Sequence, residues 1–209
     1  MSAGQPRPAT PAQTVKPSRR SAAAAASAIV FGVLARRAAR GTISASEERW
    51  FRAINNMSPA LRAPVWLVMQ SGSLAAVPLT AAAAFPRHRP TAVALAIDGT
   101  AVWALCKQVK RVIRRGRPGH HLADVVIYGA AQRGAGFPSG HAAVATTLVT
   151  IGSRLLPKRA ARLVWAVPLI VGASRQFVGA HLPLDVAGGA ALGLSTGTLT
   201  NLVLDVATS

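Results

Sequence analysis

The chain has 209 residues, 51% of them hydrophobic, and carries 24 Lys and Arg against 6 Asp and Glu. This length suits one domain, and the single cysteine, Cys106, excludes an internal disulfide and a cysteine-based metal site. Only 5% of the residues are aromatic, so the net charge of +18 indicates anionic lipid and a phosphorylated ligand rather than nucleic acid.

The N-terminal region divides into three segments of different composition. Residues 1–20 are rich in Pro, Ser, Thr and Gln and are predicted to form a disordered basic tail. The Ala-rich run 21–35 predicts a short first membrane span, with a helix lying at the interface as the alternative. Residues 41–62 place apolar side chains at helical spacing among polar ones, which predicts a segment along the membrane surface.

Several later runs have the length and apolarity of membrane spans, which need about 20 mostly apolar residues. We therefore predict an all-α, integral-membrane bundle of about six transmembrane helices. The expected spans are residues 21–35, 63–85, 91–109, 140–156, 163–180 and 184–204. Cys106 is expected to be inert packing, and Asp98 to pair with a polar group inside the bundle.

A polar, glycine-rich stretch from Lys110 to Ser139 joins the third and fourth expected spans, and a loop of this length is usually functional or disordered. It opens with KRVIRRGRP, in which Lys110, Arg114 and Arg117 would share one face if the preceding helix continued. Three cations on one face could clamp a phosphate, or could simply be a basic cluster at the interface.

The second block is Pro138-Ser139-Gly140-His141, at the start of the fourth expected span. Ser139 is a suitable N-cap, and the free N–H groups of a helix start attract phosphate. Gly140 would let the backbone approach a ligand. His141 could then donate a proton to a leaving oxygen, or could be an interfacial histidine without a task.

The third block places Ser174 and Arg175 at the end of the fifth expected span, with His181 and Asp185 at the start of the sixth. His181 and Asp185 are four residues apart, so they share a helix face or meet across a helix start. A carboxylate bonded to one ring nitrogen fixes the tautomer and leaves the other nitrogen free to attack. Charged groups at a span end are costly unless they are used.

Together the blocks resemble the signature of the PAP2 superfamily, which reads K-x6-RP, then PSGH, then SR-x5-H-x3-D. This superfamily includes type 2 phosphatidic acid phosphatases, prenyl-diphosphate phosphatases and vanadium haloperoxidases. All eleven specified positions match in order, and the resemblance covers about residues 50–204. It implies that residues 21–209 form a multi-pass phosphatase domain in the cell membrane. The expected partners are a lipid or polyprenyl phosphate and an anionic bilayer, with no nucleic acid.

The resemblance also implies roles for individual residues. His181 would attack phosphorus and form a phosphohistidine, Asp185 would orient it, and His141 would protonate the departing alcohol and then activate water. No metal or other cofactor is expected, because three cations can neutralise the phosphate and acidic residues are scarce. The groups expected to bind the phosphate are Lys110, Arg117, Ser139, Gly140 and Arg175.

Three questions stay open at this level. Arg111, Arg114 and Arg115 exceed the family signature, and they either widen the anionic pocket for a pyrophosphate or face lipid headgroups. The distribution of positive charge among the loops does not decide which side of the membrane the active site faces. Bacterial relatives favour an active site outside the cytoplasm. A vanadium-dependent haloperoxidase and a non-catalytic binder of lipid phosphates are the alternative functions, disfavoured by the apolar runs and by the paired His181 and Asp185 respectively.

Overall fold

The computed structural model describes residues 18–207, and within that range the regular structure is entirely helical. The first two helices, α1 (Arg19–Ala39) and α2 (Ala45–Asn55), are followed by a bent pair and a long helix. The remaining elements are η1 (Pro59–Leu61), α3 (Arg62–Met69), η2 (Gln70–Gly72), α4 (Ala76–Ala84), α5 (Arg89–Val112), α6 (Pro118–His121), α7 (Gly140–Gly152), η3 (Ser153–Leu155), α8 (Lys158–Leu163), α9 (Ala166–Phe177) and α10 (Pro183–Ala207). The expected all-α fold is confirmed.

Most of the tail expected at residues 1–20 lies outside the described residues. The last two residues of that range, Arg19 and Arg20, belong to α1, which begins at Arg19. Ser18 caps this helix, because its side chain accepts a hydrogen bond from the amide of Ser21. The Ala-rich run that follows carries the helix to Ala39, past the end expected at residue 35.

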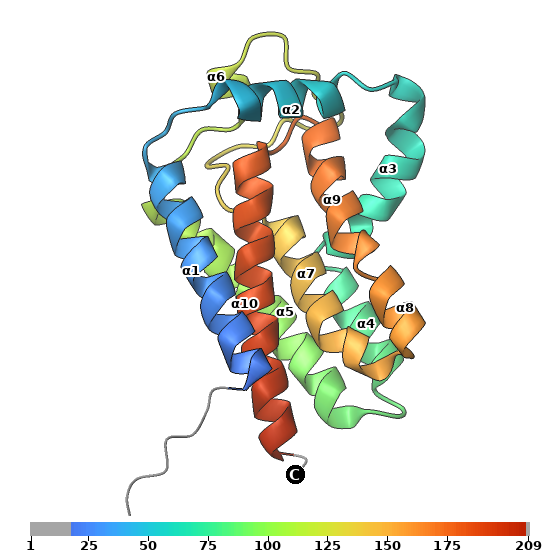
Figure 1. Ribbon diagram of the computed structural model, residues 1–209. Coiled ribbons are helices and arrows are strands. Elements are labelled where there is room, and N and C mark those ends of the chain that lie inside the picture. The colour runs from blue at the N-terminus through green and yellow to red at the C-terminus, as the bar shows by residue number, and fades with distance from the viewer. Residues whose placement is uncertain (1–17, 208–209) are drawn as a thin grey trace, which may run out of the picture.

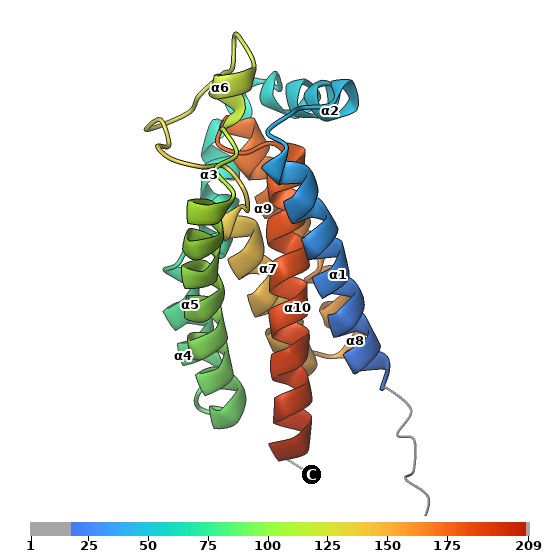
Figure 2. The same ribbon diagram turned by 90° about the vertical axis from the view of Figure 1, so that its left-hand side faces the viewer.

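The long helices run side by side, with α10 between α1 and α7 and with α5 on the other side of α7 (Figures 1 and 2). Helix α2 lies across one end of this bundle, next to α6 (Figure 1). In α2 the side chain of Phe51 is buried and that of Trp50 is 62% exposed, which gives the helix the two faces expected of a surface segment.

The number of spans is less regular than expected. In the described residues, three helices are long and apolar enough to cross a membrane, namely α1, α5 and α10. The segment expected to span at 63–85 passes as one possible span, but it is sharply bent, because η1, α3 and η2 meet α4 at an angle of 63°. The break falls at Ser73, whose backbone is extended and whose hydroxyl bonds the carbonyl of Gln70.

Helices α7 and α9 have 13 and 12 residues, which is short of the length of about 20 that one continuous span requires. Six continuous spans are therefore not confirmed. With the bent pair counted as one span, four segments have the length and composition to cross a membrane.

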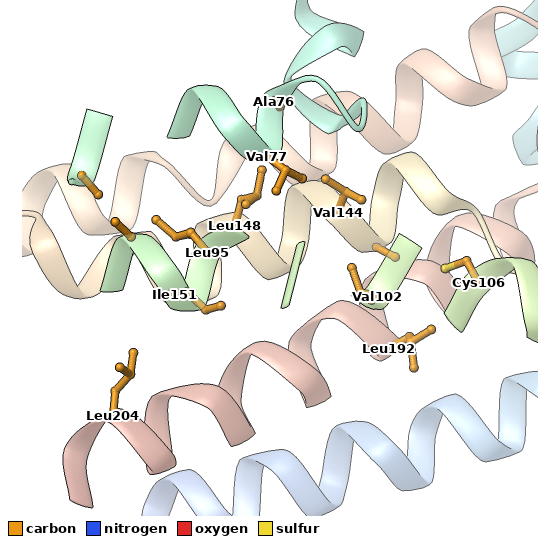
Figure 3. Close-up of a cluster of buried hydrophobic side chains, with 13 residues drawn as sticks. Ala76, Val77, Leu95, Val102, Cys106, Val144, Leu148, Ile151, Leu192 and Leu204 are labelled. Atoms are coloured by element: carbon orange, nitrogen blue, oxygen red, sulfur yellow. The ribbon is translucent and has the colours of Figure 1, made fainter. Parts of the chain in front are cut away.

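The main core lies between α4, α5, α7 and α10, where Val77, Val102, Val144 and Leu148 meet (Figure 3). Cys106 is 1% exposed within this cluster, so its expected role in packing is confirmed. Asp98, also in α5, accepts a hydrogen bond from the hydroxyl of Thr200 in α10 at 3.0 Å, as expected for a carboxylate inside the bundle.

Helices α7 and α10 approach each other closely because α10 presents glycines to α7. A Cβ on Gly189 would lie 2.2 Å from the carbonyl oxygen of Ser139, and one on Gly193 would lie 2.3 Å from that of Ala143. Small residues at this spacing let helix backbones touch. The contact brings the start of α7 against the start of α10, which positions the candidate site.

Candidate active site

Four helix ends meet at the end of the bundle that α2 covers. Helices α5 and α9 end there, and α7 and α10 begin there (Figures 1 and 2). The three sequence blocks sit on these ends, so the tertiary structure gathers residues that are about 70 positions apart in the chain. Backbone contacts lock the arrangement, since the amide of Ser139 donates to the carbonyl of Asp185 at 2.8 Å.

His181 and Asp185 form the centre of this region. Both are buried, and His181 Nδ1 lies 3.7 Å from Asp185 Oδ2. That separation exceeds a hydrogen bond of about 2.9 Å, so Asp185 acts on the ring in this structure through its charge. Because Nδ1 faces the carboxylate, Nε2 is the ring nitrogen directed away from it and free for chemistry.

Burial controls the protonation of His181. Loss of water around the ring lowers the pKa of His181 to about 3, against the opposing effect of Asp185 and with a further lowering from the nearby cations. The ring is therefore neutral near pH 7. A neutral imidazole carries the lone pair that a nucleophile needs.

Arg115 holds Asp185 in place, and this corrects the sequence prediction. Its side chain is fully buried, and it donates to Asp185 Oδ1 at 2.9 Å and to Glu47 Oε2 at 2.8 Å. Arg115 therefore neither faces lipid headgroups nor widens an anionic pocket. Burial disfavours its charge, but hydrogen bonds and charges from Glu47 and Asp185 outweigh burial and raise the pKa of Arg115.

The network continues from Arg115 into α2 and back to α10. Glu47 Oε1 accepts a hydrogen bond from the amide of Leu184 at 3.0 Å. Asp185 Oδ2 accepts another from the amide of Leu182 at 3.0 Å. Sequence reasoning missed Glu47 and the pairing of Arg115. Their signal was an acidic residue in a chain with only six, placed on the apolar side of an amphipathic helix.

Lys110 and Arg117 reach the site although the expected helix face does not exist. Helix α5 ends at Val112, and Ile113 adopts an extended backbone, so Arg114 leaves the helix and stays exposed. Lys110 Nζ donates to two carbonyls of the loop at 3.0 and 2.8 Å, and Arg117 donates to three backbone carbonyls. These acceptors are the carbonyls of Ala135, Gly136, Gly134, Ala180 and Arg133.

Arg175 is the most isolated of the three cations. It is 5% exposed, its Nη1 contacts the sulfur of Met69 at 3.0 Å, and its Nε has no partner among the described residues. No carboxylate within the described chain forms an ion pair with it. A thioether is a weak acceptor, so the charge of Arg175 is largely uncompensated.

The start of α7 completes the region. Ser139 is fully buried and caps the helix, with its hydroxyl accepting from the amide of Ala142 at 3.5 Å. Gly140 and His141 form the first turn. His141 and His181 both lie within electrostatic range of Lys110 and Arg175, so the structure arranges the two imidazoles around the same cations.

Hydrogen bonds and a ring stack hold the loop around Val126 and Tyr128 beside the site. Asn55 in α2 donates to the carbonyls of Val126 and Phe177 at 2.9 Å, and its own side-chain oxygen accepts from the amide of Val126. Tyr128 then stacks on Phe177, with ring centroids 4.9 Å apart. Part of the long polar stretch is therefore held against the C-terminal end of α9.

Among residues 18–207, no group of three or more His, Cys, Asp or Glu side chains is arranged to hold a metal ion. The polar groups of the site are two imidazoles, one carboxylate and a surplus of cations. Such a set suits an anion with a transferable group, and a phosphoryl group is the biological example.

Comparison with known proteins agrees with the geometry. The profile of the PAP2 superfamily matches residues 66–208. The chain belongs to the PAP2 superfamily. It is accordingly a phosphatase, as the sequence blocks implied.

Three individual proteins show sequence or structural similarity to this chain. The chain is 34% identical over 127 residues to decaprenylphosphoryl-5-phosphoribose phosphatase of Mycobacterium tuberculosis. This alignment covers 60% of this chain and 68% of the relative. The crystal structure of Aquifex aeolicus LpxE aligns with a TM-score of 0.71 and 25% identity, over 76% of this chain and 96% of LpxE. The transmembrane PAP2-type phosphatidylglycerolphosphate phosphatase of Bacillus subtilis shares the fold, with a TM-score of 0.71 and 22% identity over 88% and 96% of the two chains.

Proposed function

We propose that this PAP2-family phosphatase removes a terminal phosphate from a lipid-linked substrate, most specifically a polyprenyl phosphate, through a phosphohistidine on His181. The observation that carries the proposal is the buried, uncompensated Arg175 beside Lys110 and Arg117. Burying an unpaired charge costs several kcal/mol, so the fold maintains this region at a cost that an anionic ligand relieves.

The first chemical step follows from the orientation of His181. Its Nε2 lone pair attacks phosphorus, the phosphorus–oxygen ester bond breaks, and His141 gives a proton to the departing alkoxide. Burial and the charges of Arg175 and Lys110 lower the pKa of His141 to about 3, so its ring holds this proton when the bound phosphate anion offsets those charges. Asp185 balances the positive charge that the ring of His181 gains. Lys110, Arg117 and Arg175 neutralise the equatorial oxygens as charge is redistributed.

The second step reverses the role of His141. As a neutral base it takes a proton from water, the water oxygen attacks phosphorus, and the phosphorus–nitrogen bond breaks to restore His181. The electron pair of the broken phosphorus–nitrogen bond returns to the ring of His181, and inorganic phosphate leaves. Both histidines end the cycle in the protonation states in which they began it, as catalysis requires.

Metal independence is part of the proposal. The cations of the site supply the charge neutralisation that Mg²⁺ supplies in other phosphoryl-transfer enzymes. Purified protein should therefore release phosphate equally well with and without EDTA.

The lipid class is supported by the apolar helices and by the relatives. The Mycobacterium relative is named for a decaprenyl-linked substrate, and LpxE is a structural relative in the same superfamily. These relatives favour phosphatase chemistry over halide oxidation, and the complete set of His141, His181 and Asp185 favours turnover over binding alone.

The decisive experiment measures phosphate release from a short-chain polyprenyl phosphate with EDTA present. His181→Ala and His141→Ala should lose activity by at least about 1,000-fold, since both take part directly in bond breaking. A denaturing quench at alkaline pH during turnover of the unmodified enzyme should trap phosphate on His181, because a phosphorus–nitrogen bond survives base and hydrolyses in acid, and the same quench of His181→Ala should trap none. Full activity in either variant would refute the mechanism.

We also propose that the active site faces the outside of the cell. Both described ends of the chain lie at the opposite end of the bundle from α2 and the site (Figure 1). A C-terminal fluorescent-protein fusion should therefore be fluorescent in the cytoplasm, whereas a C-terminal alkaline phosphatase fusion should be inactive. The reverse pattern would place the site inside.

A further inference from the structure

A groove of about 560 Å³ lies between α4 and α7, and its lining also takes in η3 and the turn that joins α4 to α5. The apolar part of this α4–α7 groove includes Ala83, Ala84, Leu95, Leu148, Val149 and Val167. Along α7 it extends from Ala145 to Gly152, about 10 Å of helix, against roughly 15 Å for the hydrocarbon of one bilayer leaflet. The groove therefore has the length and character to hold much of one acyl chain.

The turn that joins α4 to α5 lies at the end of the bundle away from α2 and the candidate active site (Figure 1). Helix α5 begins after this turn at Arg89 and carries Lys110 to the site in its last turn. Its 24 residues extend about 36 Å, which exceeds the hydrocarbon thickness of about 30 Å. Arg87 and His88, which line the groove from this turn, therefore lie at the bilayer face opposite the site.

Arg87 is an exposed cation whose side chain has no partner in the described part of the chain. Its guanidinium forms no ion pair, hydrogen bond or ring contact with any residue from 18 to 207. Asp205, which α10 carries to this end of the bundle, is bound by Arg154 at 3.1 Å. Arg89 differs, because its guanidinium lies 5.5 Å from the centre of the Phe85 ring and it does not line the groove. Arg87 is thus available to an anion at the groove.

The hydroxyl groups of the lining do not require a polar ligand. Ser71, Thr80 and Ser153 each donate to a backbone carbonyl of the preceding helical turn, at 2.7, 2.8 and 3.2 Å. Because each of these donors is used within its own segment, the walls formed by α4 and α7 offer apolar surface to a ligand. Recognition of charge is left to the turn at Arg87, so the groove suits a molecule with an apolar body and an anionic end.

The groove also touches the segment that supports the catalytic residues. Ser71 in η2 belongs to its lining, and the next residue, Gly72, packs against the start of α7. A Cβ on Gly72 would lie 2.6 Å from the carbonyl oxygen of His141, so η2 and α7 are in close backbone contact. A ligand in the groove would contact both α4 and α7, and would hold the bent pair against the helix that carries His141.

We propose that the α4–α7 groove binds one anionic phospholipid of the leaflet opposite the active site, with its headgroup phosphate at Arg87 and one acyl chain along α7. Charge complementarity selects this ligand, because an unpaired cation at a bilayer surface attracts anionic headgroups. A zwitterionic lipid with the same chains lacks the net charge, and free phosphate lacks the apolar contact. Neither catalytic histidine lines the groove, so this proposal stands apart from the proposed function.

The test titrates the melting temperature of the full-length protein, in one detergent, with dioleoyl phosphatidylglycerol and with dioleoyl phosphatidylcholine, which share their acyl chains. A ligand that binds only the folded state raises the melting temperature. Arg87→Gln should weaken the apparent affinity for phosphatidylglycerol about 10-fold, the effect of one lost charge-assisted contact. Arg89→Gln is the matched control and should change this affinity by less than about 2-fold, because Arg89 is also exposed near the turn but does not line the groove.

A second variant tests the apolar part of the groove. Gly152 belongs to the lining and a Cβ there meets nothing within 4 Å, so Gly152→Leu should fill the groove without displacing its walls. This variant should lose the stabilisation by phosphatidylglycerol, whereas Gly32→Leu, which gains a side chain in open space outside the groove, should keep it. Equal losses in Arg87→Gln and Arg89→Gln would reduce the effect to general surface charge and overturn the proposal. Unchanged binding in Gly152→Leu, or an equal shift by inorganic phosphate that Arg87→Gln removes, would overturn it as well.

Discussion

Arg115 should be the most sensitive single position for stability outside the reacting groups. Its side chain is fully buried, and it is bonded at 2.9 and 2.8 Å to Asp185 and Glu47. Arg115→Met keeps much of the volume but leaves both carboxylates without their cation. Removing one partner of a buried ion pair costs about 3–5 kcal/mol. For a domain of this size, that loss should lower the melting temperature by roughly 6–20 °C.

The matched control is an exposed Arg–Glu pair whose two residues both lie in α2. Arg52 bonds Glu48 at 2.8 Å, but these side chains are 37% and 38% exposed. Arg52→Met should cost less than about 1 kcal/mol, because water screens an exposed pair. Both variants can be followed in the same detergent by thermal unfolding monitored with tryptophan fluorescence.

Activity provides a second measurement of the same network. With Arg115 absent, Asp185 loses the bond at Oδ1 that sets its position beside His181. The kcat on a short-chain substrate should fall much more than KM rises, measured well below the melting temperature of the variant. If Arg115→Met and Arg52→Met had equal melting temperatures, the buried network would not carry the stability assigned to it.

Two further predictions concern helix packing and protonation. Gly189→Leu should abolish activity, because even the Cβ of the new side chain would lie 2.2 Å from the carbonyl oxygen of Ser139, so that α7 must move. Gly32→Leu should be tolerated, because a Cβ at that position meets nothing within 4 Å. Equal activities of the two variants would contradict the role given to the contact between α7 and α10. Below the usual histidine pKa of about 6.5 the unfolded chain protonates His181, but the folded site stays neutral to about pH 3, so stability should fall as pH drops through this window. Urea unfolding of His181→Gln should show a flatter acid dependence, and an unchanged slope would count against the buried neutral ring.

The local sequence was sufficient for the parts of the protein that depend on neighbouring residues. Apolar runs predicted the helices, since a segment that is apolar all round must be buried or in a membrane. Ser139 before Gly140 predicted the start of α7, because capping depends on a few adjacent residues. The short blocks around Lys110, His141 and His181 predicted phosphate chemistry, because their residue types have few other joint uses.

Long-range contacts settled the rest. The sequence could not show that α5 ends at Val112 and still delivers Arg117 to the site, because the loop carbonyls that hold Arg117 come from distant segments. It could not pair Arg115 with Glu47, 68 residues away, because nothing local distinguishes this arginine from Arg114. Hydrogen bonds between remote segments depend on the path of the whole chain, whereas helix formation depends on one turn at a time.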